Sequence, residues 1–102
     1  MNSNTEFSKD TLTELLHDND VEATINSKLV VFNDDYNTFD WVIQCFMQVC
    51  NHTFEQAEQL SLIVHFKGKA TVKTASLDVL KPMKDSLIDR GLSAVIDSLV
   101  ED

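Results

Sequence analysis

Basic residues are scarce in this sequence. Among 102 residues there are 8 lysines and arginines against 17 aspartates and glutamates, which gives a formal net charge of −9 at pH 7. Such a charge repels the phosphate backbone of nucleic acids and the anionic surface of a membrane at ordinary salt. We therefore expect no nucleic-acid or membrane partner, while the same negative field favours a cationic ligand such as an ammonium group.

Cysteine is also rare, since only Cys45 and Cys50 are present. Residues five apart on one helix point about 140° away from each other, so these two cannot form a disulfide or share a metal within that helix. They are typical of small buried side chains in a reducing compartment. The first residues contain no basic run followed by an apolar stretch, and no apolar window approaches the length of a membrane span. We expect the protein to stay in the cytoplasm.

The length allows one domain with a compact core. Residues 1–27 are rich in Asp, Glu, Asn, Ser and Thr and hold too few apolar residues for a core of their own. We expect them to form a flexible N-terminal extension, with a short helix possible at Leu12, Leu15 and Leu16 because of their helical spacing. Residues 28–102 are expected to form the folded domain.

The first half of this domain predicts a strand followed by two helices. A β-branched and aromatic run, residues 29–32, is ended by the turn-forming residues 33–35. Thr38 and Thr53 can each cap a helix. The apolar positions with helical spacing are Trp41, Val42, Cys45, Phe46, Val49 and Cys50 in the first helix, and Ala57, Leu60, Ile63 and Val64 in the second.

The second half predicts a strand, a helix and a last strand. Residues 69–74 alternate polar and apolar side chains, Ser76 can cap a helix, and residues 92–99 favour a strand. Pro82 falls inside the third helix, where a proline costs about 3 kcal/mol, so we expect an irregular first turn or a regular helix that begins near Pro82. The order β-α-α-β-α-β indicates an α+β fold with a small, mainly antiparallel three-stranded sheet.

Two polar features stand out as candidate functional residues. Asn33, Asp34 and Asp35 follow the first strand, and His65 lies in the last turn of the second helix. Each has an ordinary explanation, because Asn and Asp side chains favour turns and a histidine near a helix C-terminus suits the helix dipole.

Together with their neighbours, these residues resemble the ClpS family of protease adaptors over most of residues 29–99. The matching segments are Asn33-Asp34-Asp35-Tyr36, Gln56-Ala57 with Leu60, Val64-His65-Phe66-Lys67-Gly68-Lys69-Ala70, and more weakly Arg90-Gly91-Leu92-Ser93-Ala94. The third looks like the family's Val-His-Tyr-x-Gly-Lys-Ala signature. The resemblance implies a small α+β domain behind a mobile N-terminal extension.

The resemblance to the ClpS family also implies a function that needs neither catalysis nor a cofactor. A ClpS adaptor binds the free α-amino group and the bulky first side chain, Leu, Phe, Tyr or Trp, of substrates of the N-end rule (N-degrons). It then delivers them to the N-terminal domain of a Clp AAA+ unfoldase, of ClpA or ClpC type, for degradation. We expect a monomer that acts as such an adaptor.

The resemblance assigns three groups of residues. The expected amine-binding residues are Asn33, Asp34, Asp35 and His65; the expected side-chain pocket is Phe39, Val42, Ser61, Val64 and Ala94; and the expected unfoldase-docking residues are Asp78 and Lys84. Ordinary core packing is the alternative for all five pocket residues, and above all for Val42 and Val64. Family members often have Met at the positions of Phe39 and Ser61, so we expect this pocket to accept aromatic residues at least as well as Leu. Protonation of His65 is expected to weaken amine binding.

Two other classes of function stay open. The first is an enzyme or a metal site built from Asp34, Asp35 and His65, since two carboxylates and an imidazole can ligate a divalent ion. Neither His17 nor His52 is placed to help, and the sequence has no Gly-rich phosphate loop and no Ser or Cys nucleophile paired with a base. The alternative to a ligand-binding adaptor is a general protein-interaction module, since the fold resembles the C-terminal domain of the ribosomal stalk protein, which has no pocket for an N-terminal residue.

Overall fold

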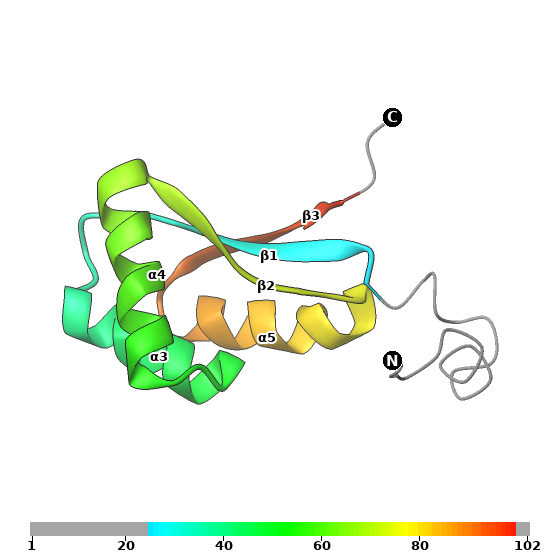
Figure 1. Ribbon diagram of the computed structural model, residues 1–102, viewed down its shortest axis with the longest axis horizontal. Coiled ribbons are helices and arrows are strands. Elements are labelled where there is room, and N and C mark those ends of the chain that lie inside the picture. The colour runs from blue at the N-terminus through cyan, green and yellow to red at the C-terminus, as the bar shows by residue number, and fades with distance from the viewer. Residues whose placement is uncertain (1–24, 100–102) are drawn as a thin grey trace, which may run out of the picture.

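The structure is a computed structural model that describes residues 25–99. Its elements are β1 (Ser27–Phe32), α3 (Phe39–Cys50), α4 (Phe54–Lys67), β2 (Lys69–Ala75), α5 (Leu77–Asp89) and β3 (Ser93–Ser98) (Figure 1). The α+β class and the order β-α-α-β-α-β are therefore confirmed. Most of the predicted extension, including its helix at Leu12–Leu16, lies outside the described residues and stays a prediction.

β1 is the central strand of an antiparallel sheet with the order β2-β1-β3. The strand begins at Ser27, two residues earlier than predicted, because Ser27 and Lys28 pair with both neighbouring strands. At its other end, Phe32 lies opposite Lys69, the first residue of β2. This register places the loop after β1 directly beside the end of α4.

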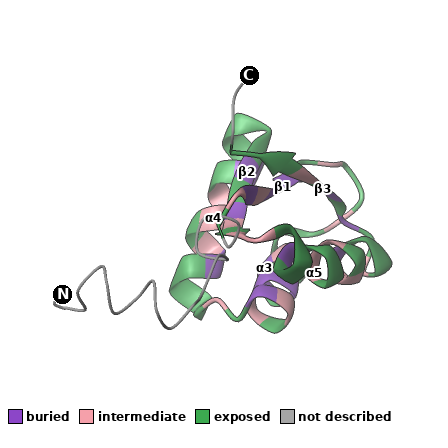
Figure 2. Ribbon diagram, turned by 90° about the vertical axis from the view of Figure 1, so that its right-hand side faces the viewer, coloured by how far each residue is buried: buried purple, intermediate pink, exposed green. Residues whose placement is uncertain are grey.

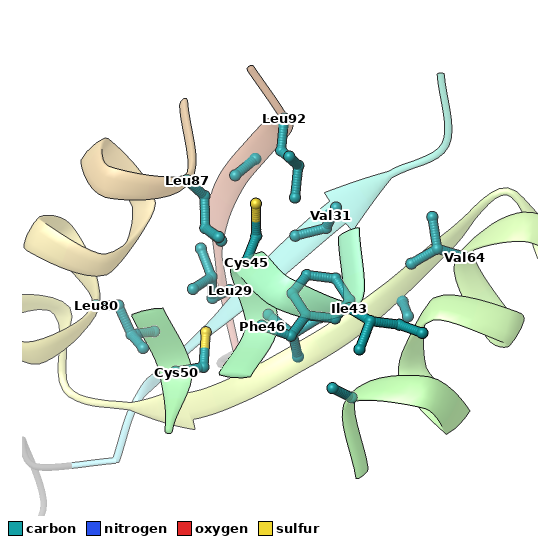
Figure 3. Close-up of a cluster of buried hydrophobic side chains, with 14 residues drawn as sticks. Leu29, Val31, Ile43, Cys45, Phe46, Cys50, Val64, Leu80, Leu87 and Leu92 are labelled. Carbon is teal, nitrogen blue, oxygen red and sulfur yellow. The ribbon is translucent and has the colours of Figure 1, made fainter. Parts of the chain in front are cut away.

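All three helices pack on one side of the sheet, and α3 contacts both α4 and α5 (Figure 1). Figure 2 shows the buried residues on the sides of the helices and strands that face one another. The core between them, drawn in Figure 3, consists of Leu29, Val31, Ile43, Cys45, Phe46, Cys50, Ala57, Val64, Ala70, Val72, Leu80, Leu87, Leu92 and Ala94. Both cysteines are free and buried, as predicted. Within residues 25–99, none of the helices combines the length and apolar character needed to cross a membrane.

The helix ends follow the predicted capping residues. The Thr38 hydroxyl accepts the Trp41 N–H at 3.1 Å. Thr53 and Gln56 form a reciprocal capping box, in which each side chain accepts the other's backbone N–H. Gly68 ends α4 with a φ of +94°, a left-handed conformation that favours glycine. The direction of α4, and with it the position of His65, is thus set at both ends of the helix.

The expectation for Pro82 is wrong. α5 runs from Leu77 to Asp89 with Pro82 inside it, and Ser76 caps it. The proline removes an N–H that would bond the carbonyl of residue 78, at a cost of about 3 kcal/mol. Leu80 and Leu87 are fully buried on the same helix, and each contributes about 1.5–3 kcal/mol. Their burial offsets the cost, so the helix continues through the proline.

Two side chains that were predicted to belong to the apolar stripes, Trp41 and Ile63, are exposed in the structure. Trp41 is 38% exposed, and its indole N–H donates to the Arg90 carbonyl at 3.0 Å, while Ile43 takes its place in the core. In α4, Ile63 is exposed, whereas the polar Ser61 is buried. The buried face of α4 is therefore made by Ala57, Ser61 and Val64, which have the spacing i, i+4, i+7.

Candidate functional site

A cavity of about 370 Å³ lies between the loop after β1, the start of α3 and the C-terminal half of α4. Its lining residues are Asn33, Asp34, Asp35, Asn37, Phe39, Val42, Ser61, Leu62, Val64, His65 and Phe66. The pairing of Phe32 with Lys69 brings the two segments together, and the Asn33 N–H then donates to the Gly68 carbonyl at 2.9 Å. Residues more than thirty positions apart in the sequence therefore share one site.

The structure gathers nearly all the predicted site residues in this cavity. The four expected amine-binding residues and four of the five expected pocket residues line it. Ala94 does not: it lies on β3 opposite Val31, is 6% exposed and belongs to the hydrophobic core. The side chain of Ala94 is thus a core side chain, and its predicted place in the pocket is not found in this structure.

Three lining residues were missed from the sequence: Asn37, Leu62 and Phe66. Leu62 and Phe66 are each the next residue after a predicted one on α4, and their four-residue spacing was a usable signal. Asn37 carried no such signal, because its role depends on a contact with a distant loop. Its side-chain amide donates to the Gly91 carbonyl at 2.9 Å.

The Asp34 carboxylate accepts hydrogen bonds from residues of its own loop. One carboxylate oxygen accepts the backbone N–H groups of Tyr36 and Asn37 at 2.9 and 2.8 Å, and the other accepts the Asn37 side-chain amide at 2.7 Å. Partial burial acts to raise the pKa of Asp34, but these hydrogen bonds outweigh it and hold the pKa below its ordinary value. Asp34 is therefore an ionised carboxylate that fixes the loop, as the turn interpretation of this sequence suggested.

Asp35 and His65 are both exposed beside the cavity. The His65 ring makes an edge-to-face contact with Phe66, with centroids 4.8 Å apart and an interplanar angle of 77°. Within residues 25–99, no side chain or carbonyl hydrogen-bonds to that ring. Its nitrogens are thus open to solvent or to a ligand at the mouth of the cavity.

The interior of the cavity is largely apolar. Val64 is buried, Val42 is half-buried, and Phe39 is 38% exposed where α3 begins. Ser61 is the polar exception among these buried lining residues. The site therefore combines hydrogen-bond acceptors at its mouth with an apolar interior, which suits a ligand with a charged or polar head and a hydrophobic body.

The predicted docking residues lie apart from this cavity, on α5. Asp78 is exposed in the first turn of that helix, and the Lys84 ammonium group is 3.5 Å from the Asp85 carboxylate. No residue of α5 lines the cavity. A partner on α5 and a ligand in the cavity could therefore be bound at the same time.

Among residues 25–99, the side-chain geometry does not support a metal site. In the described part of the chain, no three His, Cys, Asp or Glu side chains are grouped so that they could hold a metal ion. Asp34, one of the three candidate ligands, already accepts three hydrogen bonds.

Comparison with known proteins defines the class of this chain. The family profile described as "ATP-dependent Clp protease adaptor protein ClpS" matches residues 23–95. The ATP-dependent Clp protease adapter protein ClpS of Thermosynechococcus vestitus is 35% identical over 69 residues, which are 67% of this chain and 73% of the relative. The ClpS of Neisseria meningitidis is 29% identical over 88 residues, covering 86% of this chain and 82% of the relative.

A solved structure agrees in fold. Agrobacterium tumefaciens ClpS2 bound to L-phenylalaninamide superimposes with a TM-score of 0.69 at 19% identity, covering 72% of this chain and 96% of that one. The chain belongs to the ClpS family of ATP-dependent Clp protease adaptor proteins. It is thus an adaptor of a Clp protease and not itself the protease.

Proposed function

We propose that the adaptor binds protein substrates by their N-terminal residue and delivers them to a Clp AAA+ unfoldase in the cytoplasm. The substrate class is that of the N-degrons, with a free α-amino group and a bulky hydrophobic first side chain. The observation that carries this proposal is the cavity itself, which joins acceptors at its mouth to an apolar interior. The acceptors at the mouth suit the amino group, and the apolar interior suits the first side chain.

The mouth of the cavity suits an ammonium group. A free α-amino group carries positive charge and three donors, which need three acceptors. The side-chain oxygen of Asn33, the carboxylate of Asp35 and an unprotonated ring nitrogen of His65 provide them. We favour Asp35 over Asp34 as the direct partner, because Asp34 already accepts three hydrogen bonds, although its ionised carboxylate adds to the local negative field. Each charge-assisted bond contributes roughly 1.5–3 kcal/mol.

The interior suits a single bulky side chain. Phe39, Val42 and Val64 present apolar surface, and burial of a Leu or Phe side chain against it contributes roughly 1.5–3 kcal/mol. The similarly folded ClpS2 of A. tumefaciens was solved with L-phenylalaninamide, a ligand with a free amine and an aromatic side chain. The translational and rotational entropy lost on association costs a comparable free energy. We therefore expect moderate, reversible affinity, as a delivery step requires.

Delivery requires a second surface, and α5 is our candidate for it. Asp78 and Lys84 lie on this helix away from the cavity, so they can contact an unfoldase N-terminal domain while a substrate is bound. Residues 1–27 suit an assisting role in delivery by their polar composition. The proposed unfoldase is of ClpA or ClpC type.

Fluorescence anisotropy of labelled peptides tests the proposal. The peptides begin with Phe, Leu, Trp or Ala and are otherwise identical, and each has a free or an acetylated amino terminus. Acetylation removes the charge and two donors, so we expect it to weaken binding of the Phe peptide by at least about 100-fold. The Ala peptide controls for the side-chain pocket. Equal binding of free and acetylated peptides would overturn the proposal and favour a general interaction module.

A further inference from the structure

The hydroxyl of Ser61 is unusual among the buried polar groups. The residue is 2% exposed, and its Oγ is the one buried side-chain oxygen or nitrogen in residues 25–99 without a hydrogen-bond partner. A serine inside a helix commonly donates to the carbonyl four residues earlier, but no such bond is formed here within the described residues. Since nearly all buried polar side-chain atoms have partners, this one calls for an explanation.

The position of Ser61 points to a ligand as the missing partner. Ser61 and His65 are four residues apart on α4, so they lie on the same face of the helix, and both line the cavity. Four residues of helix span about 6 Å, close to the reach of a tyrosine side chain from Cα to its hydroxyl. A first residue whose amine is held at His65 can therefore extend its side chain to the level of Ser61.

We propose that Ser61 is a specificity-determining residue that makes the pocket favour tyrosine as the first residue of the substrate. This inference rests on the proposed function of the cavity. The phenol O–H of tyrosine can donate to the Ser61 Oγ or accept from it, whereas Phe and Leu bring only carbon to that level. The Ser61 Oγ is closed to solvent in this structure, and rotation about its single χ1 torsion, which has three staggered wells, brings the hydroxyl to the phenol without any movement of the backbone.

The surroundings of Ser61 strengthen this preference. Val42 and Val64 line the cavity with apolar surface, so a phenol buried there without Ser61 would lose its water and gain no partner. A site built to hydrogen-bond a ligand hydroxyl discriminates against an analogue that lacks it, because the analogue leaves the buried protein group unpaired. Phenylalanine is such an analogue of tyrosine.

The experiment compares two peptides that differ only in Tyr or Phe at the first position, each with a free amine and with an acetylated control. Their affinities are measured by competition for wild-type protein, Ser61→Ala, Ser61→Cys and Thr74→Ala. Cysteine keeps the shape of serine but hydrogen-bonds weakly. Thr74 is exposed on β2 opposite Lys28, at the far end of the sheet from Asn33, and serves as the matched control.

We expect wild type and Thr74→Ala to bind the Tyr peptide more tightly than the Phe peptide by a factor between about 2 and 10. In Ser61→Ala and Ser61→Cys, this ratio should fall to one or below. If free-amine peptides bind but the ratio is at or below one in wild type, or is the same in Ser61→Ala, the inference about Ser61 is overturned while the proposed function stands. If neither free-amine peptide binds wild type, both fail.

Discussion

Asn37 donates to the Asp34 carboxylate from both its backbone and its side chain, at 2.8 and 2.7 Å, and its amide also reaches the Gly91 carbonyl at 2.9 Å. This one pair connects the loop after β1 to the loop before β3. Because the same loop carries Asn33 and Asp35, its conformation sets the mouth of the cavity. In the proposed binding mode, the positions of those two residues therefore depend on a pair that need not contact the ligand.

The Asp34 carboxylate should contribute to stability in a pH-dependent way. Substitution Asp34→Ala is expected to lower the free energy of unfolding by about 1–2 kcal/mol at neutral pH, because it removes three hydrogen bonds to the loop. The pKa of Asp34 is lowered in the folded state, so this stabilisation is present above the ordinary carboxyl value and is lost as pH falls below about 4.

Urea unfolding of wild type and Asp34→Ala from neutral pH to about pH 3 measures this contribution. The difference between the two proteins should shrink toward the acidic end. Asp35→Ala is the matched control, since Asp35 is exposed on the same loop, and we expect a change within about 0.5 kcal/mol. A loss for Asp35→Ala as large as that for Asp34→Ala would contradict the distinct roles assigned to the two carboxylates.

Loss of the His65 ring should weaken binding of a Phe peptide. The ring is exposed beside the cavity, and its replacement in His65→Ala removes one acceptor for the ligand amine. We expect the affinity measured by anisotropy to fall by about 10-fold or more. His65→Gln, which keeps a side-chain acceptor, should lose less affinity than His65→Ala. Unchanged affinity in His65→Ala would argue that the ring does not accept a bond from the amine.

Pro82 should be a site where stability can be gained. It is exposed inside α5, so Pro82→Ala restores a helical N–H without disturbing the core. Proline costs about 3 kcal/mol in a helix but also restricts the unfolded chain by roughly 0.4–1 kcal/mol, so we expect a net gain of about 2–2.6 kcal/mol in the free energy of unfolding measured with urea. Lys81→Ala, at the exposed neighbouring position, controls for general helix propensity. A loss of stability in Pro82→Ala would show that the proline has a structural role in α5.

Both thiols should be unreactive in the folded protein. Burial raises the pKa of the Cys50 thiol to about 11 and also raises that of Cys45, although nearby Lys73 and Arg90 oppose the shift. Since the thiolate is the nucleophile, labelling with a thiol reagent at pH 8 should require unfolding and should follow the urea transition. Rapid labelling of one thiol in native buffer would mean that the core opens locally around that cysteine.

The parts of the fold that were predicted correctly are those determined by local chemistry. Thr38, Thr53 and Gly68 set helix ends through their own side chains or backbone conformation, so the sequence alone identified them. Pro82 was misjudged because its local cost is offset by buried leucines on the same helix, a tertiary effect. Trp41 was wrongly predicted to lie in the core, and Ile43 was left out of the predicted stripe, because the indole N–H of Trp41 donates to a carbonyl in a distant loop.

In the candidate site, too, some residues were predicted from the sequence and others depend on tertiary contacts. The resemblance supplied Asn33, Asp35 and His65, but only the pairing of Phe32 with Lys69 explains why these residues meet. The different role of Asp34 depends on Asn37, which no motif marked. Ala94 could not be assigned from the sequence, since a small residue on β3 suits the core as well as a pocket.

The central claim, that the cavity holds a free amine together with a bulky side chain, is tested most directly by NMR. A ¹⁵N-labelled sample of the whole chain is titrated with a short peptide that begins with Phe, and the acetylated peptide serves as the control. We expect saturable shifts of backbone amides confined mainly to residues 33–42 and 61–68, with none from the acetylated peptide. Shifts centred on α5 or on the outer face of the sheet, or equal shifts from both peptides, would contradict the account.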